Sequence, residues 1–203
     1  MKKTTLTLII LFAGIIISWA QEAETDTVKY QKAPNFTLMS TENKNVTLDS
    51  LLKKGPVYLE CWDIPCVNCI KELDALMPIY DSLKERGLQI IALSVDKPAD
   101  EPKVKVKVKS KKWQYYVLLD NKGKVKNLYN ITIKPTAYLI NQKGEIVYTH
   151  IGFKQGDEKR IKAEFLKWLP ESGLLDEGSI RPAEQPAEKE KSGKESESEE
   201  KGK

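Results

Sequence analysis

The sequence predicts a single α/β domain in which helices cover a mixed β-sheet. Short apolar runs typical of buried strands alternate with segments whose apolar residues recur at helical spacing. Late in the domain, two strand-like runs follow each other across a four-residue turn, which predicts an antiparallel hairpin. A chain of 203 residues has room for one such domain with a tail at each end. The domain is expected to span residues 32–171.

The first 20 residues have the composition of a secretory signal. Two lysines precede an apolar run from Leu6 to Trp19, and Ser18-Trp19-Ala20 supplies a small-x-small end. We expect cleavage after Ala20, and the alternative is an uncleaved anchor, although the run is short for a membrane span. Residues 21–31 are polar and are expected to form a linker. Export would place the domain in a compartment where disulfides persist.

The first long strand is expected from Val57 to Trp62, an apolar run that follows Lys54-Gly55-Pro56. A helix is expected soon after it, because apolar residues recur at helical spacing among charged ones. These apolar residues are Ile70, Leu73, Leu76 and Met77. Cys66 therefore falls at the start of a helix.

Two further strands are expected in the middle of the chain, from Gln89 to Val95 and from Tyr115 to Leu119, the second closed by a turn at residues 120–123. Between them, Lys103 to Lys109 alternates lysine and valine. Strict alternation favours a strand, but we expect a helix because the family resemblance described below places one there. Val104 and Val108 would then share a face and leave Val106 exposed.

The hairpin is expected from strands 137–140 and 146–150, joined by residues 141–144. A final helix should begin with Asp157 as its N-cap and stop at Pro170. Its apolar stripe consists of Ile161, Phe165, Trp168 and Leu169. Residues 172–203 lose all apolar periodicity, and we expect them to form a disordered charged tail.

The charge of the chain does not indicate a nucleic-acid partner. The net charge is only +4, and acidic and basic residues nearly balance in the tail. Six lysines between Lys103 and Lys112 form a basic patch. The patch is interpreted as a solvated face, and docking to an acidic partner or an anionic lipid surface is the alternative.

Cys66-Val67-Asn68-Cys69 is the chemically most informative motif. Two thiols separated by two residues can close and reopen a disulfide ring, and the start of a helix favours a thiolate at the first position. A structural zinc site needs four ligands, and only Cys61 and His150 remain to complete one. Redox chemistry is therefore favoured over metal binding.

The motif and its surroundings resemble the thioredoxin superfamily, and within it the TlpA/ResA-like periplasmic thiol-disulfide oxidoreductases. The segments that carry this resemblance, in the order of that group, are Ala33 to Leu38, Val46 to Leu51, Leu59 to Trp62 with the CxxC pair, and Tyr129 to Asn141. The resemblance covers roughly residues 32 to 169. It implies a thioredoxin fold with an N-terminal β-hairpin extension and a cis-proline at Pro135.

Two positions depart from the family pattern. The family usually has tryptophan directly before the first cysteine and proline five residues after the second, but this chain has Pro65 and Asp74 there. Pro65 removes an aromatic platform beside the thiols, so partner choice cannot be carried over. Pro78 is expected to bend the helix in place of the missing proline.

The resemblance assigns roles to residues near the thiols. Cys66 is expected to attack substrate disulfides, and Cys69 to resolve the mixed disulfide. Glu60 is a lone acid in an apolar strand at the place of the buried acid of thioredoxins. Burial would raise its pKa and let it accept the proton of Cys69, unless it faces water at an edge. Glu72 is expected to tune the thiols, and the alternative is a solvated helix position.

The segment Lys134-Pro135-Thr136 is expected to bind substrate. Pro135, if cis, would offer strand-like hydrogen bonds to an incoming peptide, and Lys134 would favour the Cys66 thiolate and acidic substrates. Cys61 and His150 are expected to be a buried small residue and an ordinary strand residue.

Together these features predict an exported protein-disulfide reductase that needs no organic cofactor and no metal. Asn68 places no positive charge between the cysteines, unlike the histidine of strongly oxidising relatives, and this favours reduction. Protein disulfides are the expected substrates, a membrane-embedded thiol protein is the expected electron donor, and the protein should be a periplasmic monomer that binds no nucleic acid.

Two other function classes are compatible with the fold. A peroxide-reducing enzyme would need threonine three residues before its reactive cysteine and proline four residues further back, and no cysteine here has that context. A thioredoxin-fold copper chaperone would use soft thiolates and a histidine. The two cysteines are one residue closer than in that family, and the metal content of the reduced protein would separate the two functions.

Overall fold

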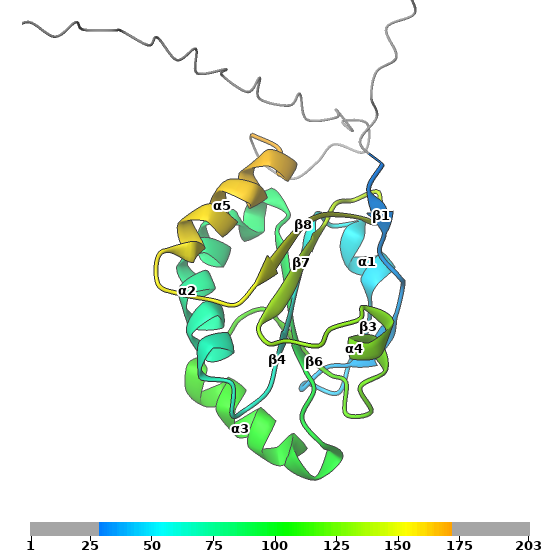
Figure 1. Ribbon diagram of the computed structural model, residues 1–203, viewed down its shortest axis with the longest axis vertical. Coiled ribbons are helices and arrows are strands. Elements are labelled where there is room, and N and C mark those ends of the chain that lie inside the picture. The colour runs from blue at the N-terminus through cyan, green and yellow to red at the C-terminus, as the bar shows by residue number, and fades with distance from the viewer. Residues whose placement is uncertain (1–28, 172–203) are drawn as a thin grey trace, which may run out of the picture. The chain divides into compact units, whose positions relative to one another are not determined.

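A computed structural model describes residues 29–171, and within this range residues 31–171 form one α/β unit (Figure 1). The strands are β1 (Gln31–Lys32), β2 (Thr37–Met39), β3 (Asn45–Thr47), β4 (Val57–Trp62), β5 (Gln89–Ser94), β6 (Tyr116–Leu119), β7 (Thr136–Ile140) and β8 (Glu145–Ile151). The helices are α1 (Leu48–Leu52), α2 (Val67–Leu83), α3 (Glu101–Lys111), α4 (Lys124–Leu128) and α5 (Asp157–Trp168), with 3₁₀ turns η1 (Lys84–Arg86) and η2 (Pro98–Asp100).

The main sheet is mixed, as the sequence predicts. Its strand order is β1-β8-β7-β4-β5-β6. The central strand β4 runs parallel to β5 and antiparallel to β7, and β7 and β8 form the expected hairpin. Strands β2 and β3 pair separately and antiparallel, which provides the expected N-terminal hairpin.

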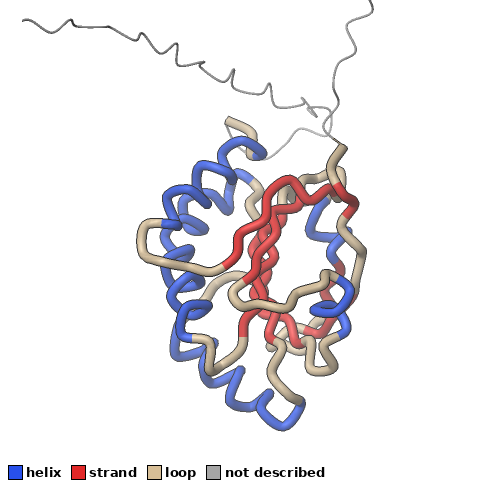
Figure 2. Tube along the Cα trace, in the orientation of Figure 1, coloured by secondary structure: helices blue, strands red, loops and turns tan. Residues whose placement is uncertain are grey.

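Helices cover both faces of the sheet, as Figures 1 and 2 show. One core cluster joins the sheet to α2, α3 and α5, and a second joins it to α1, α4 and the β2–β3 hairpin. Every residue of β4 is buried for this reason. Because alternate residues of a strand point to opposite faces, Tyr58, Glu60 and Trp62 face α2, whereas Leu59 and Cys61 face the α1 side.

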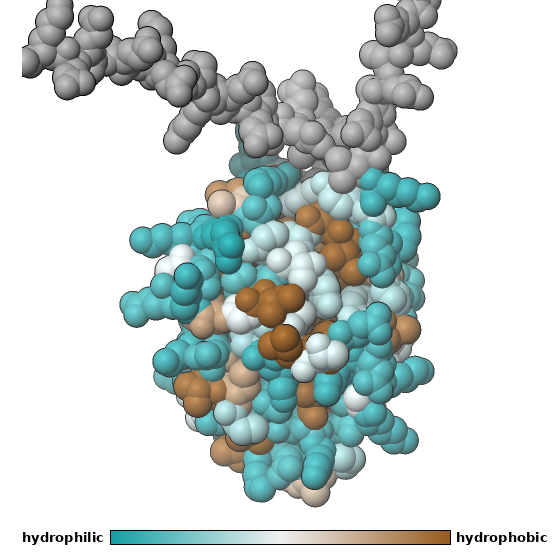
Figure 3. All heavy atoms as spheres, viewed as in Figure 1, coloured by the Kyte–Doolittle hydropathy of each residue, from teal (hydrophilic) through white to brown (hydrophobic). Residues whose placement is uncertain are grey.

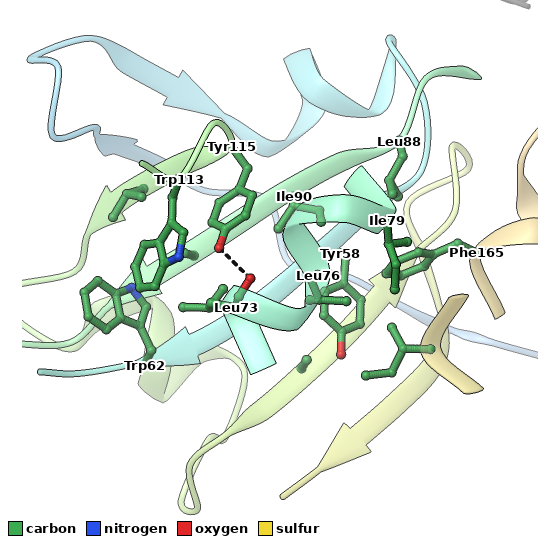
Figure 4. Close-up of a cluster of buried hydrophobic side chains, with 14 of the residues drawn as sticks. Tyr58, Trp62, Leu73, Leu76, Ile79, Leu88, Ile90, Trp113, Tyr115 and Phe165 are labelled. Atoms are coloured by element: carbon green, nitrogen blue, oxygen red, sulfur yellow. Dashed lines mark hydrogen bonds between the residues drawn. The ribbon is translucent and has the colours of Figure 1, made fainter. Parts of the chain in front are cut away.

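The core beneath α2 combines aromatic rings with leucine and isoleucine side chains (Figure 4). The rings of Trp62 and Trp113 meet edge to face with centroids 5.0 Å apart. The hydroxyl of Tyr115 donates to the backbone carbonyl of Leu73 at 3.0 Å. These contacts join the segment that leads into β6 to β4 on one side and to α2 on the other, and so hold the helix whose first residues carry the cysteines.

The lysine-valine segment is helical, which confirms the expectation for α3. Val104 is fully buried and Val108 is partly buried against the same core, but Val106 is 69% exposed. Two residues advance a helix by about 200°, so a valine midway between two buried ones must face outward.

The boundaries of several elements differ slightly from those expected. Strand β4 has the predicted limits, while β5 lacks Val95 and β6 lacks Tyr115 at their ends. Gln31, assigned to the linker, instead pairs with Ile146 as part of β1. The linker prediction was therefore one residue too long.

The predicted N-cap of the last helix is wrong. Gly156 occupies the N-cap position with a φ of +104°, and Asp157 is the first helical residue. The carboxylate of Asp157 accepts a hydrogen bond from the backbone N–H of Lys154 at 3.0 Å, upstream of the helix. A backbone with φ in this range favours glycine, which explains why the cap is not Asp157.

The expected signal segment, nearly all of the linker and the charged tail lie outside the described residues. Within residues 29–171, no helix combines the length and the apolar character that crossing a bilayer requires.

Candidate active site

Cys66 and Cys69 are joined by a disulfide at the start of α2. Cys66 is the N-cap residue of the helix, and its Sγ accepts a hydrogen bond from the backbone N–H of Cys69 at 3.2 Å. The side chain of Cys66 is half-buried, while Cys69 is completely buried. In the reduced protein, the same N–H and the positive end of the helix dipole favour a thiolate at Cys66.

The loop between β4 and α2 is attached to the end of the neighbouring strand. The backbone N–H of Ile64 donates to the carboxylate of Asp96 at 3.1 Å, and this carboxylate also accepts from the Ser94 hydroxyl at 3.0 Å. Sequence reasoning missed Asp96, although its place at the carboxyl end of a strand parallel to β4 was a usable signal. Asp96 positions the loop that precedes the cysteines.

Glu60 is fully buried on the face of β4 that carries α2. Its strand neighbours in register are Ala92 and Ala137, whose small side chains leave room for a carboxyl group. Among the described residues, neither carboxylate oxygen has a hydrogen-bond partner. Burial and then the charge of Glu72 raise the pKa of Glu60 well above its usual range. The alternative of an edge position in water is wrong.

Glu72 is also fully buried and reaches the same layer from α2. The hydroxyl of Tyr58 donates to its Oε1 at 2.7 Å, while Oε2 has no partner within the described part of the chain. Burial raises the pKa of Glu72 to about 8; the hydrogen bond from Tyr58 opposes this shift, and the charge of Asp157 adds to it. A solvated helix position is therefore excluded, and the structure buries two protonatable acids between β4 and α2.

The Lys134–Pro135 peptide bond is cis, as expected from the resemblance. Pro135 is buried, and its carbonyl accepts from the backbone N–H of Gly152 at 2.8 Å. Thr136 begins β7 opposite Cys61 of β4, and its hydroxyl donates to the carbonyl of Ile133 at 2.8 Å. The register brings this segment next to the strand that leads into the active-site loop.

Lys134 forms an ion pair with Asp63, three residues before Cys66. The structure places this cation beside the active-site loop, and its expected effect on the Cys66 thiolate stays a prediction. Sequence reasoning did not anticipate the carboxylate of Asp63, which offsets the charge of Lys134. The pair joins two loops that are far apart in the sequence.

Cys61 and His150 take no part in the disulfide. Cys61 is buried on the opposite face of β4 from Glu60, and burial raises the pKa of its thiol to about 12. His150 is buried in β8, stacked on Tyr148, and burial lowers its pKa. Within residues 29–171, no group of three or more His, Cys, Asp or Glu side chains could hold a metal ion.

Comparison with known proteins places this site in a family. The model of the AhpC/TSA family matches residues 30–149. The thiol-disulfide oxidoreductase ResA of Bacillus cereus is 36% identical over 124 residues, which cover 60% of this chain and 69% of ResA. The sporulation thiol-disulfide oxidoreductase A of Bacillus subtilis (strain 168) is 29% identical over 154 residues, 75% of this chain and 92% of the relative.

Solved structures agree with the sequence relatives. The crystal structure of StoA from Bacillus subtilis superposes with a TM-score of 0.55 at 26% identity, covering 64% of this chain and 95% of StoA. The thioredoxin fold implied by the sequence is thereby confirmed. The chain belongs to the AhpC/TSA family, among its thioredoxin-fold members that resemble the ResA-type thiol-disulfide oxidoreductases.

Proposed function

We propose that the protein is an exported thiol-disulfide oxidoreductase that reduces disulfides of other proteins outside the cytoplasm. The observation that carries this proposal is the Cys66–Cys69 disulfide at the N-terminus of α2, with one half-exposed and one buried sulfur. The names of the relatives, which are thiol-disulfide oxidoreductases, support the same activity.

The first step joins enzyme and substrate. The Cys66 thiolate attacks one sulfur of the substrate disulfide, a Cys66–substrate bond forms, and the substrate S–S bond breaks. The departing substrate sulfur leaves as a thiolate and takes a proton from water. The Cys69 N–H and the start of α2 stabilise the attacking Cys66 thiolate.

The second step releases the substrate. Cys69 loses its proton, its sulfur attacks Sγ of Cys66, and the second substrate sulfur departs. Two electrons have then passed from the dithiol to the substrate, and Cys66–Cys69 is again a disulfide. Glu60 is the proton acceptor for Cys69 in this proposal, because it is a buried acid without a hydrogen-bond partner among the described residues, on the face of β4 that carries the cysteine helix.

The remaining residues position the reactants. Glu72, held by Tyr58, keeps a second carboxyl group near Glu60 and so tunes proton exchange with the thiols. Lys134, Pro135 and Thr136 form the substrate-facing segment, where an extended peptide would add main-chain hydrogen bonds. Catalysis in this scheme uses only groups of the protein itself, without a cofactor.

A reductant that works outside the cytoplasm needs a source of electrons. A dithiol in an oxidising compartment stays reduced only if a donor recharges it, so the proposal includes a membrane-embedded thiol protein as partner and a monomeric, periplasmic enzyme. Dithiol potentials in this superfamily run from roughly −270 mV in thioredoxin to roughly −120 mV in DsbA. A reductant should lie near the thioredoxin end.

Reduction of insulin disulfides by the reduced protein tests the proposed activity. Cys66→Ser should abolish it, whereas Cys61→Ser should leave it largely intact, because Cys61 is buried on the other face of β4. Equal loss in both variants would contradict the assignment of Cys66. Equilibration with glutathione buffers gives the potential, and a value near that of DsbA would contradict the reductant role.

A further inference from the structure

A groove lies beside the active-site loop, on the side of α3. Its volume is about 380 Å³, and the residues that line it are Ile64, Pro102, Lys103, Val106, Lys107 and Ser110. Ile64 precedes Cys66 by two residues, so the chain from the groove to the nucleophile spans at most about 7 Å. A substrate held by Cys66 must therefore pass close to this groove.

The apolar part of the groove includes a side chain that does not pack against the core. Val106 is 69% exposed, while Val104 and Val108 on the same helix pack against the core. Hydrophilic side chains cover most of the face in Figure 3, and the apolar side chains on it form only a few separate patches. An exposed valine beside the partly exposed Ile64 offers a surface for an apolar side chain of another molecule.

The charge around the groove is unbalanced. Three of the lysines from Lys103 to Lys112 have acidic partners, in the pairs Lys103–Asp100, Lys105–Glu101 and Lys111–Asp74. The other three, Lys107, Lys109 and Lys112, have no acidic partner among residues 29–171. Lys107 is the one of these three that lines the groove.

Within the described part of the chain, the acids nearest the active-site loop form no ion pair with these lysines. Asp63 is paired with Lys134, and Asp96 accepts bonds from the Ile64 N–H and the Ser94 hydroxyl. A partner that covers the groove would thus meet an apolar surface with an unneutralised ammonium group at its edge. The complementary chemistry is an apolar side chain next to an acidic one.

We propose that this groove binds an apolar side chain of the substrate protein close to its reactive cysteine, and that Lys107 selects substrates with an acidic residue beside it. The proposal rests on the thiol-disulfide exchange function given above. An extended peptide advances about 3.3 Å per residue, so the apolar residue should stand two or three positions from the cysteine bound to Cys66. This contact is separate from the main-chain docking at Pro135.

Reduction of matched peptide disulfides tests the proposal. Each peptide carries one cysteine, joined by a disulfide to 2-mercaptoethanol, with a leucine three residues away that is flanked by two glutamates or by two lysines. The reduced parent protein should react with the acidic peptide about three- to fivefold faster than with the basic one, the range that exposed ion pairs give. Salt at 1 M should erase the difference, because the Debye length is then about 3 Å.

Two charge reversals on the same helix provide the decisive comparison. Lys107→Glu should invert the preference, whereas Lys109→Glu should leave it unchanged, because Lys109 does not line the groove. Val106→Ser should slow both leucine peptides relative to matched glycine peptides. Equal effects of the two lysine reversals, or no preference in the parent protein, would overturn the proposal.

Two further measurements complete the test. The first, with a small disulfide, distinguishes a failure of the groove proposal from a failure of the proposed function, and the second, with lipid vesicles, distinguishes substrate binding from membrane binding. Hydroxyethyl disulfide, small and neutral, should be reduced at the same rate by all variants. If the parent protein does not reduce it, the proposed function fails; if it is reduced while the peptides are not distinguished, only the groove proposal fails. The second measurement is binding to vesicles that contain anionic lipid. If the parent protein binds them, both lysine variants bind equally more weakly, and the peptide ratio is the same in all three proteins, the lysines serve a membrane surface and the proposal is overturned.

Discussion

At the scale of single residues, two buried carboxyl groups lie between the central strand and the helix that carries the cysteines. Glu60 comes from the central strand and Glu72 from the helix above it, and both are fully buried. Burial favours the protonated acid, and each negative charge that forms there disfavours a second. Tyr58 donates to Glu72 only, so the two acids are chemically distinct. Glu60 has no such donor among the described residues, and for this reason the proposed mechanism makes it the proton acceptor.

Replacing Glu60 with glutamine should slow the second step of the reaction selectively. The variant keeps the volume of the side chain but cannot take the proton of Cys69, so resolution of a mixed disulfide near pH 7 should fall about 100-fold or more. The first attack should change little, because the Cys69 N–H stabilises the Cys66 thiolate. Single-turnover kinetics over a pH series measure both steps, with Asp81→Asn on the surface of α2 as control. If the rate of mixed-disulfide resolution has the same pH profile in the variant as in the parent protein, Glu60 does not have this role.

The pair of Lys134 and Asp63 predicts opposite shifts from two single substitutions. Lys134→Met leaves the Asp63 carboxylate unpaired and should raise the pKa of Cys66, whereas Asp63→Asn leaves the cation unpaired and should lower it. The pH dependence of iodoacetamide labelling of Cys66 measures both shifts. The double substitution should come close to the parent value. Shifts of the same sign in both single variants would show that the pair acts through loop structure and not through charge.

At the scale of elements, a residue that departs from the family pattern links α2 to the end of α3 by hydrogen bonds. Asp74 stands where the family usually has proline, and its carboxylate accepts from the Trp113 indole N–H at 3.0 Å and from Lys111 at 2.6 Å. Trp113 is almost fully buried and follows α3 closely in the chain. The helix with the cysteines is thereby bonded to the end of the helix that borders the groove.

Removal of this contact should destabilise the protein measurably. Asp74→Ala should lower the free energy of unfolding by about 1 to 2 kcal/mol, mainly because the indole N–H of Trp113 loses its acceptor. Asp74→Asn keeps an acceptor and should cost less. The control is Asp81→Ala, which loses an exposed pair with Lys84 and should stay within about 0.5 kcal/mol. Urea titrations give these values, and equal losses at both positions would show that the Trp113 bond adds nothing.

At the scale of the whole molecule, the buried acids link folding to pH. The pKa of Glu72 is about 8 in the folded protein and near 4.3 in an unfolded chain. Between these values the unfolded chain binds fewer protons than the native one, so stability is greatest below the unfolded pKa and falls as pH rises to the folded pKa. The slope per group is at most about 1.4 kcal/mol per pH unit. Glu60 contributes with the same sign.

Glu72→Gln should therefore flatten the decline of stability between pH 6.5 and 8, as measured by urea unfolding of the oxidised protein at several pH values. Glutamine still offers an oxygen to Tyr58. The lower limit avoids the titration of His150. Because its pKa is lowered in the fold, His150 makes stability fall as the pH drops below its unfolded pKa of about 6.5, which is opposite to the effect of Glu72. The upper limit avoids Cys61, whose pKa is about 12 in the fold. A variant with the parent slope would show that Glu72 does not hold a proton near neutral pH.

Much of the fold was accessible from the sequence alone. Strand β4 and the start of α2 follow from apolar periodicity, and the position of Cys66 before Cys69 on one helical turn fixes which thiol is the outer one. These are local properties, because the period of a strand or a helix and the spacing of two cysteines are contained in a few consecutive residues.

Other features depend on how distant segments pack. The boundary of the last helix was misplaced because Gly156, and not the acidic residue after it, adopts the required backbone angle. The ion pair of Asp63 with Lys134 joins residues 71 positions apart.

By itself, the sequence determined the class of fold, the order of its elements and the redox pair. Only the tertiary structure decided that Glu60 and Glu72 share a buried layer, that Lys134 is neutralised, and that Ile64 and α3 border one groove. The physical reason is that burial and charge compensation belong to side chains brought together across elements, and no local pattern records which elements will meet.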